Sequence, residues 1–164
     1  MPPAMVIMPP DESLKLDRLQ RDILAPQLEA FLAAAPDGEA RSAYLALRDA
    51  FDALEVPAEL TARLGAMAEV LLSSGRVRNL YGPGAELSLW ALFQKTPRGR
   101  EVSASVEAAN AALKRLTGQS VEMVSAIARG PGAYALTIKT AQLQLVMRFE
   151  PAGIRFENVE VGEG

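Results

Sequence analysis

The stretch "QLQLVMRFEPAGIRFENVEV", residues 142–161, alternates apolar and polar side chains up to a turn and resumes the alternation after it. Alternation with a period of two is typical of a β-strand with one buried face, and the intervening "EPAG", residues 150–153, has the composition of a turn. The sequence therefore predicts a β-hairpin in which Phe149 faces Ile154 across the two strands.

The same register places Arg148 directly opposite Arg155 on the other face of the hairpin. Like charges that face each other across a sheet destabilise it, so this pair requires compensation. We expect one of two arrangements: solvated side chains with a neighbouring carboxylate, Glu150 or Glu157, between them, or a bound anion or acidic partner surface.

Alternating segments upstream of the hairpin extend it into an antiparallel meander. The four predicted strands are residues 120–129, 133–140, 142–150 and 154–161. One face collects the large apolar side chains of Val121, Met123, Ile127, Tyr134, Leu136, Ile138, Leu143, Leu145, Met147, Phe149, Ile154 and Phe156. We expect this face to be covered by an amphipathic helix predicted over 101–117, which Gly118 ends.

The opposite face of the meander carries small apolar side chains where a solvent-facing sheet would be polar. It collects Val124, Ala126, Ala128, Ala133, Ala135, Val146 and Val159, and the same pairing puts Glu122 opposite Lys139, a favourable cross-strand pair. We therefore predict that these seven apolar residues form an interface. Either the N-terminal helices of the same chain or the sheet of a second copy would cover it.

The N-terminal half of the chain has helical periodicity. We predict a helix from residue 11 to about 35, kinked or divided at Pro26, and an antiparallel pair of helices over 40–54 and 57–71. The stretch "GRVRNLYGPG", residues 75–84, has the glycine and proline content of a linker. Residues 86–95 are apolar nearly all round, which leaves strand and helix open, and their shortness favours a strand.

These elements predict an α+β fold, with N-terminal helices followed by a helix packed on a four- to five-stranded antiparallel meander. We divide the chain into an extended tail (1–10), a helical unit (11–75) and an α+β sheet unit (76–164). The two larger parts could also form one compact domain. The proline-bracketed tail is expected to be disordered, or else to dock as an apolar strand on a partner or on the protein itself.

The composition excludes much catalytic chemistry. The 164 residues include no cysteine and no histidine, so thiolate metal sites, disulfides and imidazole bases are all excluded. The sequence has no phosphate loop, nucleophile elbow or calcium-loop pattern. We expect a non-catalytic protein that needs no cofactor and no metal, while an enzyme using carboxylates, Lys, Arg, Tyr or Ser stays open.

Positive charge gathers in one stretch of a chain whose net charge is −3. The segment 76–100 carries five basic residues against one acidic residue. Together with the hairpin pair, its arginines are candidates for anion binding: Arg76, Arg78, Arg98, Arg100, Arg148 and Arg155. The alternative is that these arginines are ordinary polar residues of surface loops and bind no anion. Few aromatic residues accompany these arginines, so we do not expect a nucleic-acid partner.

We expect a cytoplasmic protein without a membrane partner, because the sequence shows neither a long apolar run nor the pattern of a signal peptide. The leading hypothesis is a protein–protein interaction or assembly module, acting through the apolar sheet face on a protein partner or on a second copy as a homo-oligomer. The alternative is a protein that binds a small molecule or an anion, using the Arg76–Arg100 stretch or a pocket between helix and sheet.

Overall fold

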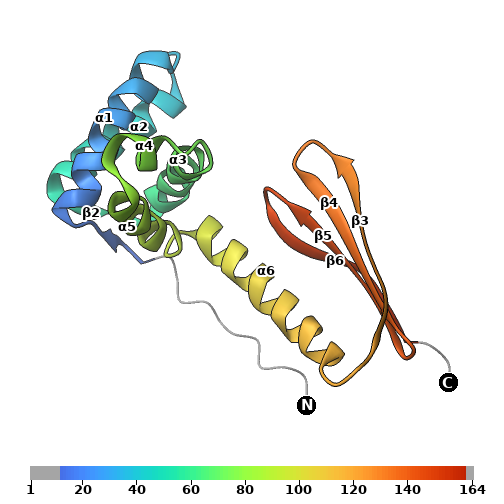
Figure 1. Cartoon of the computed structure of the whole chain (residues 1–164). Coiled ribbons are helices and arrows are strands. Elements are labelled where there is room, and N and C mark those ends of the chain that lie inside the picture. The colour runs from blue at the N-terminus through green and yellow to red at the C-terminus, as the bar shows by residue number, and fades with distance from the viewer. Residues whose placement is uncertain (1–11, 162–164) are drawn as a thin grey trace. The chain divides into compact units, whose positions relative to one another are not determined.

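The computed structural model describes residues 12–161, with side chains for residues 12–156, and has an α+β fold (Figure 1). The chain divides into two compact units between Gly99 and Arg100. The first unit is helical and the second contains a four-stranded antiparallel sheet. The tail over residues 1–10 lies outside the described residues. Within them, no helix is both long and apolar enough to cross a bilayer.

The first unit is built on three helices: α1 (Arg18–Ala34), α2 (Glu39–Ala53) and α3 (Thr61–Ser73). Helix α1 begins with a capping box, in which the Asp17 side chain accepts a hydrogen bond from the Gln20 backbone and the Gln20 side chain accepts one from the Asp17 backbone. The helix runs through Pro26, so of the two outcomes expected there, a kink or a division, the division does not occur.

The link between α2 and α3 contains structure that the periodicity did not predict. Leu54 takes a left-handed conformation with φ of 57°, and the next residues form β2 (Glu55–Val56). This short strand pairs antiparallel with β1 (Leu14–Lys15). A 3₁₀ turn, η1 (Ala58–Leu60), then leads into α3. The two-residue sheet therefore ties the start of α1 to the α2–α3 connection.

The predictions of a linker over 75–84 and a strand over 86–95 are wrong. Two helices occupy these segments, α4 (Arg76–Tyr81) and α5 (Pro83–Phe93). Gly75, with φ of 69°, separates α4 from α3, and Gly82, with φ of 89°, separates α4 from α5. The proline after Gly82 fits the first position of a helix. In the first unit, α5 packs against α1 and α3, and α4 packs against α3 and α5, so this unit extends past the boundary expected at residue 75.

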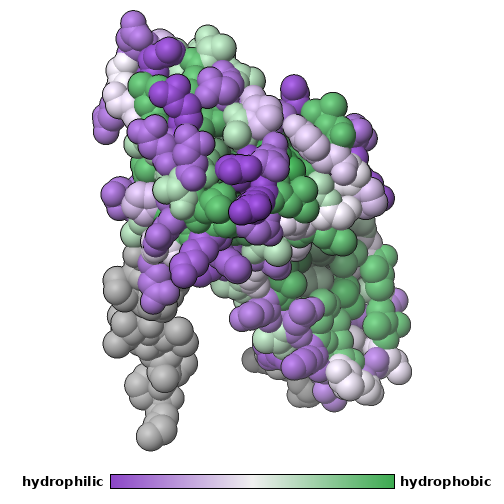
Figure 2. All heavy atoms as spheres, turned by 90° about the vertical axis from the view of Figure 1, so that its left-hand side faces the viewer, coloured by the Kyte–Doolittle hydropathy of each residue, from purple (hydrophilic) through white to green (hydrophobic). Residues whose placement is uncertain are grey.

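The core of the first unit is apolar and draws on α1, α2, α3 and α5. Its largest fully buried side chains are Ile23, Leu24, Leu28, Leu47, Phe51, Leu64, Met67, Leu89 and Leu92. Burying each such side chain contributes about 1.5–3 kcal/mol. The visible surface of this unit is dominated by hydrophilic side chains, with hydrophobic patches between them (Figure 2).

Helix α6 (Pro97–Leu113) starts earlier than the 101–117 predicted from its periodicity. The segment "TPRGR", residues 96–100, contains its first turn, because Thr96 caps the helix and accepts a hydrogen bond from the Gly99 N–H at 3.1 Å. Thr96 is buried beside Gly65 of α3, where a Cβ atom would lie 2.8 Å from the threonine hydroxyl. The turn η2 (Lys114–Leu116) ends the helical segment, and Gly118 follows with φ of 76°.

The second unit contains the predicted meander, with strands β3 (Val121–Gly130), β4 (Ala133–Thr140), β5 (Leu143–Glu150) and β6 (Gly153–Val161). The strands are antiparallel in the order β3-β4-β5-β6 (Figure 1). The predicted number, order and approximate bounds of the strands are confirmed. The predicted hairpin register is also confirmed, since Phe149 pairs with Ile154 and Arg148 pairs with Arg155.

The predicted register between β3 and β4 is wrong by one residue. Met123, and not Glu122, pairs with Lys139, because the ladder is irregular between Val121 and Met123. A β-bulge of this kind adds one residue to a strand and moves every later side chain to the other face. Val124 and Ala126 consequently share a face with the large apolar residues of β4, and Met123 and Ile127 lie on the opposite face.

The two faces of the second unit differ in burial along β5. Leu143, Leu145 and Met147, on one face, are at most 5% exposed, while the alternate residues on the other face are half-buried. Helix α6 approaches the sheet at the β5–β6 turn, where the Ile154 N–H donates to Ser105 Oγ at 3.3 Å. The large-residue face of β5 therefore forms the core of this unit.

Candidate functional site

The seven residues predicted to form one apolar interface do not lie on one face. Val124, Ala126 and Ala128 pair with Ile138, Leu136 and Tyr134, and they share the large-residue face with them. Ala133, Ala135 and Val146 belong to the opposite face, whereas Val159 pairs with Leu145. Ala135 is only 2% exposed. The register that placed these residues together is wrong, so they do not define a single interface.

The apolar surface of the sheet unit is concentrated instead on one strand, β3. All ten of its residues are exposed, on both faces of the sheet. Val124 is 59% exposed on one face, and Ile127 is 52% exposed on the other. Exposed large apolar residues on both sides of one strand are unusual for a surface that faces water in the assembled protein.

Strand β3 also forms one edge of the sheet, since it pairs with β4 alone among the described strands. An edge strand presents unpaired N–H and C=O groups and is a template for pairing with another strand. Proteins usually protect such edges with charged side chains, prolines or bulges. The regular part of β3, residues 123–128, reads "MVSAIA" and contains neither a charge nor a proline.

The opposite edge strand, β6, differs in composition. Its sequence, "GIRFENVEV", contains Arg155, Glu157 and Glu160 within nine residues. Charges along an edge discourage pairing with a further strand. The two edges of the sheet are therefore unequal, and β3 is the one suited to accept another strand.

The charges of β3 lie toward its ends. Glu122 precedes the regular segment, and Arg129 follows it. The Glu122 carboxylate makes no ion pair among the side chains of residues 12–156 that the structure places. The strand thus has an acidic end, an apolar centre and a basic end.

The opposed arginines of the hairpin are compensated within the chain. Arg148 Nε lies 3.0 Å from Glu150 Oε1, and Arg155 Nε lies 3.8 Å from Glu150 Oε2. One carboxylate therefore contacts both guanidinium groups, which is the first of the two arrangements expected from the sequence. This geometry removes the reason to invoke an anion at these two residues.

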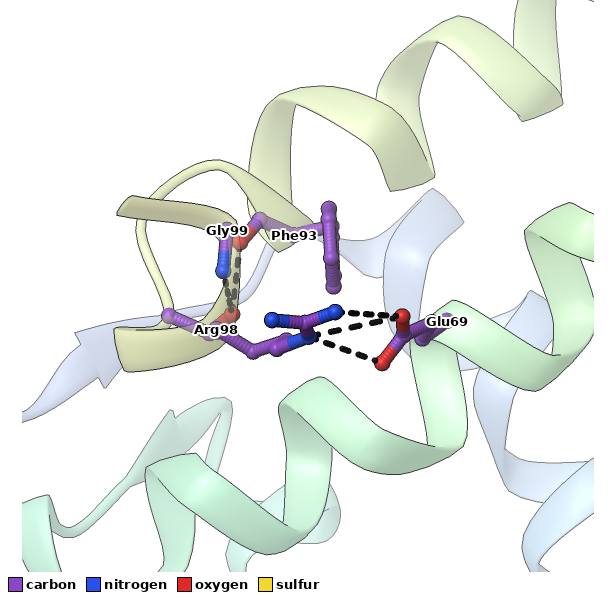
Figure 3. A network of polar contacts seen from close by, with 5 residues as sticks. Glu69, Phe93, Arg98 and Gly99 are labelled. Atoms are coloured by element: carbon purple, nitrogen blue, oxygen red, sulfur yellow. Dashed lines mark hydrogen bonds and ion pairs between the residues drawn. The ribbon is translucent and has the colours of Figure 1, made fainter. Parts of the chain in front are cut away.

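Two arginines of the basic stretch are also paired with carboxylates. Arg78 Nη1 lies 3.4 Å from Glu86 Oε1, between α4 and α5. Arg98 Nε lies 3.3 Å from Glu69 Oε2 and joins the start of α6 to α3 (Figure 3). Arg100 is half-buried in α6 and belongs to the second unit. The predicted anion-binding arginines thus have separate environments: Arg76, Arg78 and Arg98 belong to the first unit, and Arg100, Arg148 and Arg155 belong to the second.

Arg76 differs from these residues because it lines a groove. The groove lies in the helical unit between α1, α3 and α4. No ion pair to the Arg76 guanidinium occurs among the placed side chains. The sequence indicated Arg76 as a candidate because it lies in a basic stretch. It did not indicate the apolar groove, because the segment that forms α4 was predicted to be a linker.

The described part of the chain offers no group of three acidic side chains that could hold a metal ion. Comparison of the chain with family models, with curated proteins and with solved structures gave no match. The candidate sites therefore depend on the geometry of this chain alone. They are the β3 edge of the sheet and the groove beside Arg76.

Proposed function

We propose that this chain is a protein-interaction module that assembles with a second copy of itself by pairing strand β3 of one copy with β3 of the other. The observation that carries the proposal is the exposure of all ten residues of an apolar edge strand. Main-chain hydrogen bonds along such an edge give affinity, and side chains on the two faces give specificity.

The charge pattern favours a second copy as the partner. In an antiparallel pair of identical strands related by a two-fold axis, the start of one strand meets the end of the other. Glu122 of each copy then lies at the same end as Arg129 of the other copy, while Val124 and Ile127 lie near the axis. A parallel pair would instead bring like charges together, which destabilises a sheet.

The pairing would also join two four-stranded sheets into one continuous sheet of eight strands. The exposed apolar side chains of β3 would then gain neighbours on both faces, Val124 on one and Ile127 on the other. Removing apolar surface from water contributes about 25 cal/mol per Å². This contribution is the driving force that we assign to assembly.

Sedimentation velocity of the full chain tests the proposal. We expect a dimer at micromolar concentration, and we expect Val124→Lys and Ile127→Lys each to raise the dimer dissociation constant at least tenfold, because lysine on an edge opposes pairing. Leu87→Lys, at a 67% exposed apolar site in α5, is the matched control and should leave the dimer intact.

A charge exchange separates self-pairing from other modes of association. Glu122→Lys and Arg129→Glu should each weaken the dimer, and the double variant should restore it. The proposal would be overturned if the wild-type chain stayed monomeric at concentrations 100-fold above the micromolar range. It would also be overturned if the lysine variants dimerised like wild type. If both single variants dissociate and the double variant does not restore the dimer, the antiparallel pairing of β3 is excluded. The proposal would fail with it.

A further inference from the structure

We infer that the groove between α1, α3 and α4 is a binding site for a small amphipathic anion, a molecule with an apolar chain and a carboxylate head group. The cavity volume is about 680 Å³, within the range typical of small-molecule sites. This site is independent of the β3 edge, since all of its residues belong to the helical unit.

Most of the groove is apolar. It is lined by Ala30, Phe31, Ala34, Val70, Leu71 and Leu80. Val70 and Leu80 are 53% and 58% exposed, although both lie where helices converge. Side chains of this kind would pack against an aliphatic chain and would be removed from water by it.

The polar groups of the groove are few, and one of them, Gln27, lies between the buried core of α1 and the groove. Gln27 is 6% exposed as a residue, but its side-chain amide is not among the fully buried polar atoms and has no hydrogen-bond partner among the described residues. In contrast, the buried Gln20 of the same helix donates to the Ser88 carbonyl at 3.1 Å. A polar atom of a ligand in the groove would supply the partner that Gln27 lacks.

The charge of the groove selects an anion. Arg76 is the single charged residue among those that line it, and no carboxylate lines it. Asn79, on the same helix, adds a second amide. An arginine beside uncharged amides and apolar side chains matches a carboxylate attached to an aliphatic chain, because the guanidinium binds carboxylates through paired hydrogen bonds.

Titration of the full chain with decanoate, followed by calorimetry and by the methyl NMR signals of Val70, Leu71 and Leu80, tests this inference. We expect saturable binding at one site, below the micellar concentration of the probe, with shifts of these methyl signals. Decanol, which has the same chain without the charge, should bind at least twofold more weakly.

Variants locate the site. Arg76→Gln should weaken decanoate binding about two- to fivefold, as expected for a partly solvated ion pair. Arg78→Gln, two residues away on α4 and outside the groove, is the matched control and should bind like wild type. Ala30→Trp, which fills the groove from an exposed position on α1, should abolish binding, and thermal unfolding will confirm that each variant folds.

Absence of decanoate binding, equal binding of decanol and decanoate, or undiminished binding by a folded Ala30→Trp variant would each overturn the inference. Equal losses in Arg76→Gln and Arg78→Gln would do the same, since they would indicate a general effect of positive charge. None of these results depends on the oligomeric state of the chain.

Discussion

Gly99 lies so close to the backbone of Phe93 that a Cβ atom on residue 99 would stand 1.8 Å from the Phe93 carbonyl oxygen and 2.5 Å from its carbonyl carbon. These are backbone atoms, so the collision cannot be relieved by rotating a side chain. We expect Gly99→Ala to lower the free energy of unfolding by about 1–3 kcal/mol, the usual cost of overpacking a well-packed site. Urea denaturation of the full chain measures it.

Gly84 provides the control for that substitution. It lies in the first turn of α5, where a Cβ atom would meet nothing within 4 Å. Alanine there reduces the conformational freedom of the unfolded chain, so Gly84→Ala should leave stability unchanged or raise it by up to about 1 kcal/mol. Equal losses at both glycines would contradict the assignment of the Gly99 effect to the contact with Phe93.

Thr96 joins the end of α5 to the start of α6 through one hydroxyl group. Its Oγ1 donates to the Phe93 carbonyl at 2.6 Å and accepts from the Gly99 N–H at 3.1 Å, and the residue is fully buried. Thr96→Val keeps the volume but removes both bonds. We expect it to cost about 1–3 kcal/mol of unfolding free energy, the price of a lost cap and of buried groups left unsatisfied.

Thr96→Ser distinguishes the hydrogen bonds from the packing. Serine keeps the hydroxyl and loses only a methyl group, so we expect it to cost less than Thr96→Val in the same denaturation experiment. A serine variant that is less stable than the valine variant would show that the methyl group, and not the cap, sets the stability of this corner.

The meander could be predicted from the sequence because its strands alternate apolar and polar residues, and its turns contain glycine or proline. All four strands lie within one residue of their predicted starts and ends. The hairpin register around Arg148 and Arg155 was predictable for the same reason. Local pattern and local pairing agree in these segments.

Features that depend on contacts between distant segments could not be predicted. The irregularity beside Glu122 leaves the alternation of β3 unchanged in the sequence but moves its side chains to the opposite faces of the sheet. The predicted register therefore placed Val124 on the same face as Ala135, whereas the two lie on opposite faces. Helix α5 is apolar nearly all round, so its pattern does not distinguish a helix from a strand. The groove beside Arg76 exists only because α4 is helical and packs on α3.

Arg98 is expected to stabilise the fold and not to bind the anion. Its guanidinium contacts Glu69 Oε2 at 3.3 Å, and both side chains are partly exposed. Arg98→Gln should therefore lower the unfolding free energy by only about 0.5–1 kcal/mol, as usual for a solvent-screened pair. The same variant should bind decanoate like wild type, in contrast to Arg76→Gln. A loss of decanoate affinity without loss of stability would contradict this assignment.

Glu150 stabilises the last hairpin by standing between two opposed arginines. Its carboxylate lies 3.0 Å from Arg148 Nε and 3.8 Å from Arg155 Nε, across β5 and β6. Glu150→Gln keeps the shape and removes the negative charge, so the arginines then repel each other without compensation. We expect a loss of about 0.5–1 kcal/mol at low salt, because Arg155 is largely exposed and the pairs are screened by water.

The salt dependence of that loss identifies its electrostatic origin. The Debye length falls to about 3 Å at 1 M salt, so the difference in unfolding free energy between Glu150→Gln and wild type should shrink as salt is added. The control is Arg155→Gln in the Glu150→Gln background, which removes the repulsion. It should recover stability at low salt and have little effect at high salt. A loss that is the same at every salt concentration would show that Glu150 acts through packing or hydrogen bonding, and that its charge does not hold the two arginines together.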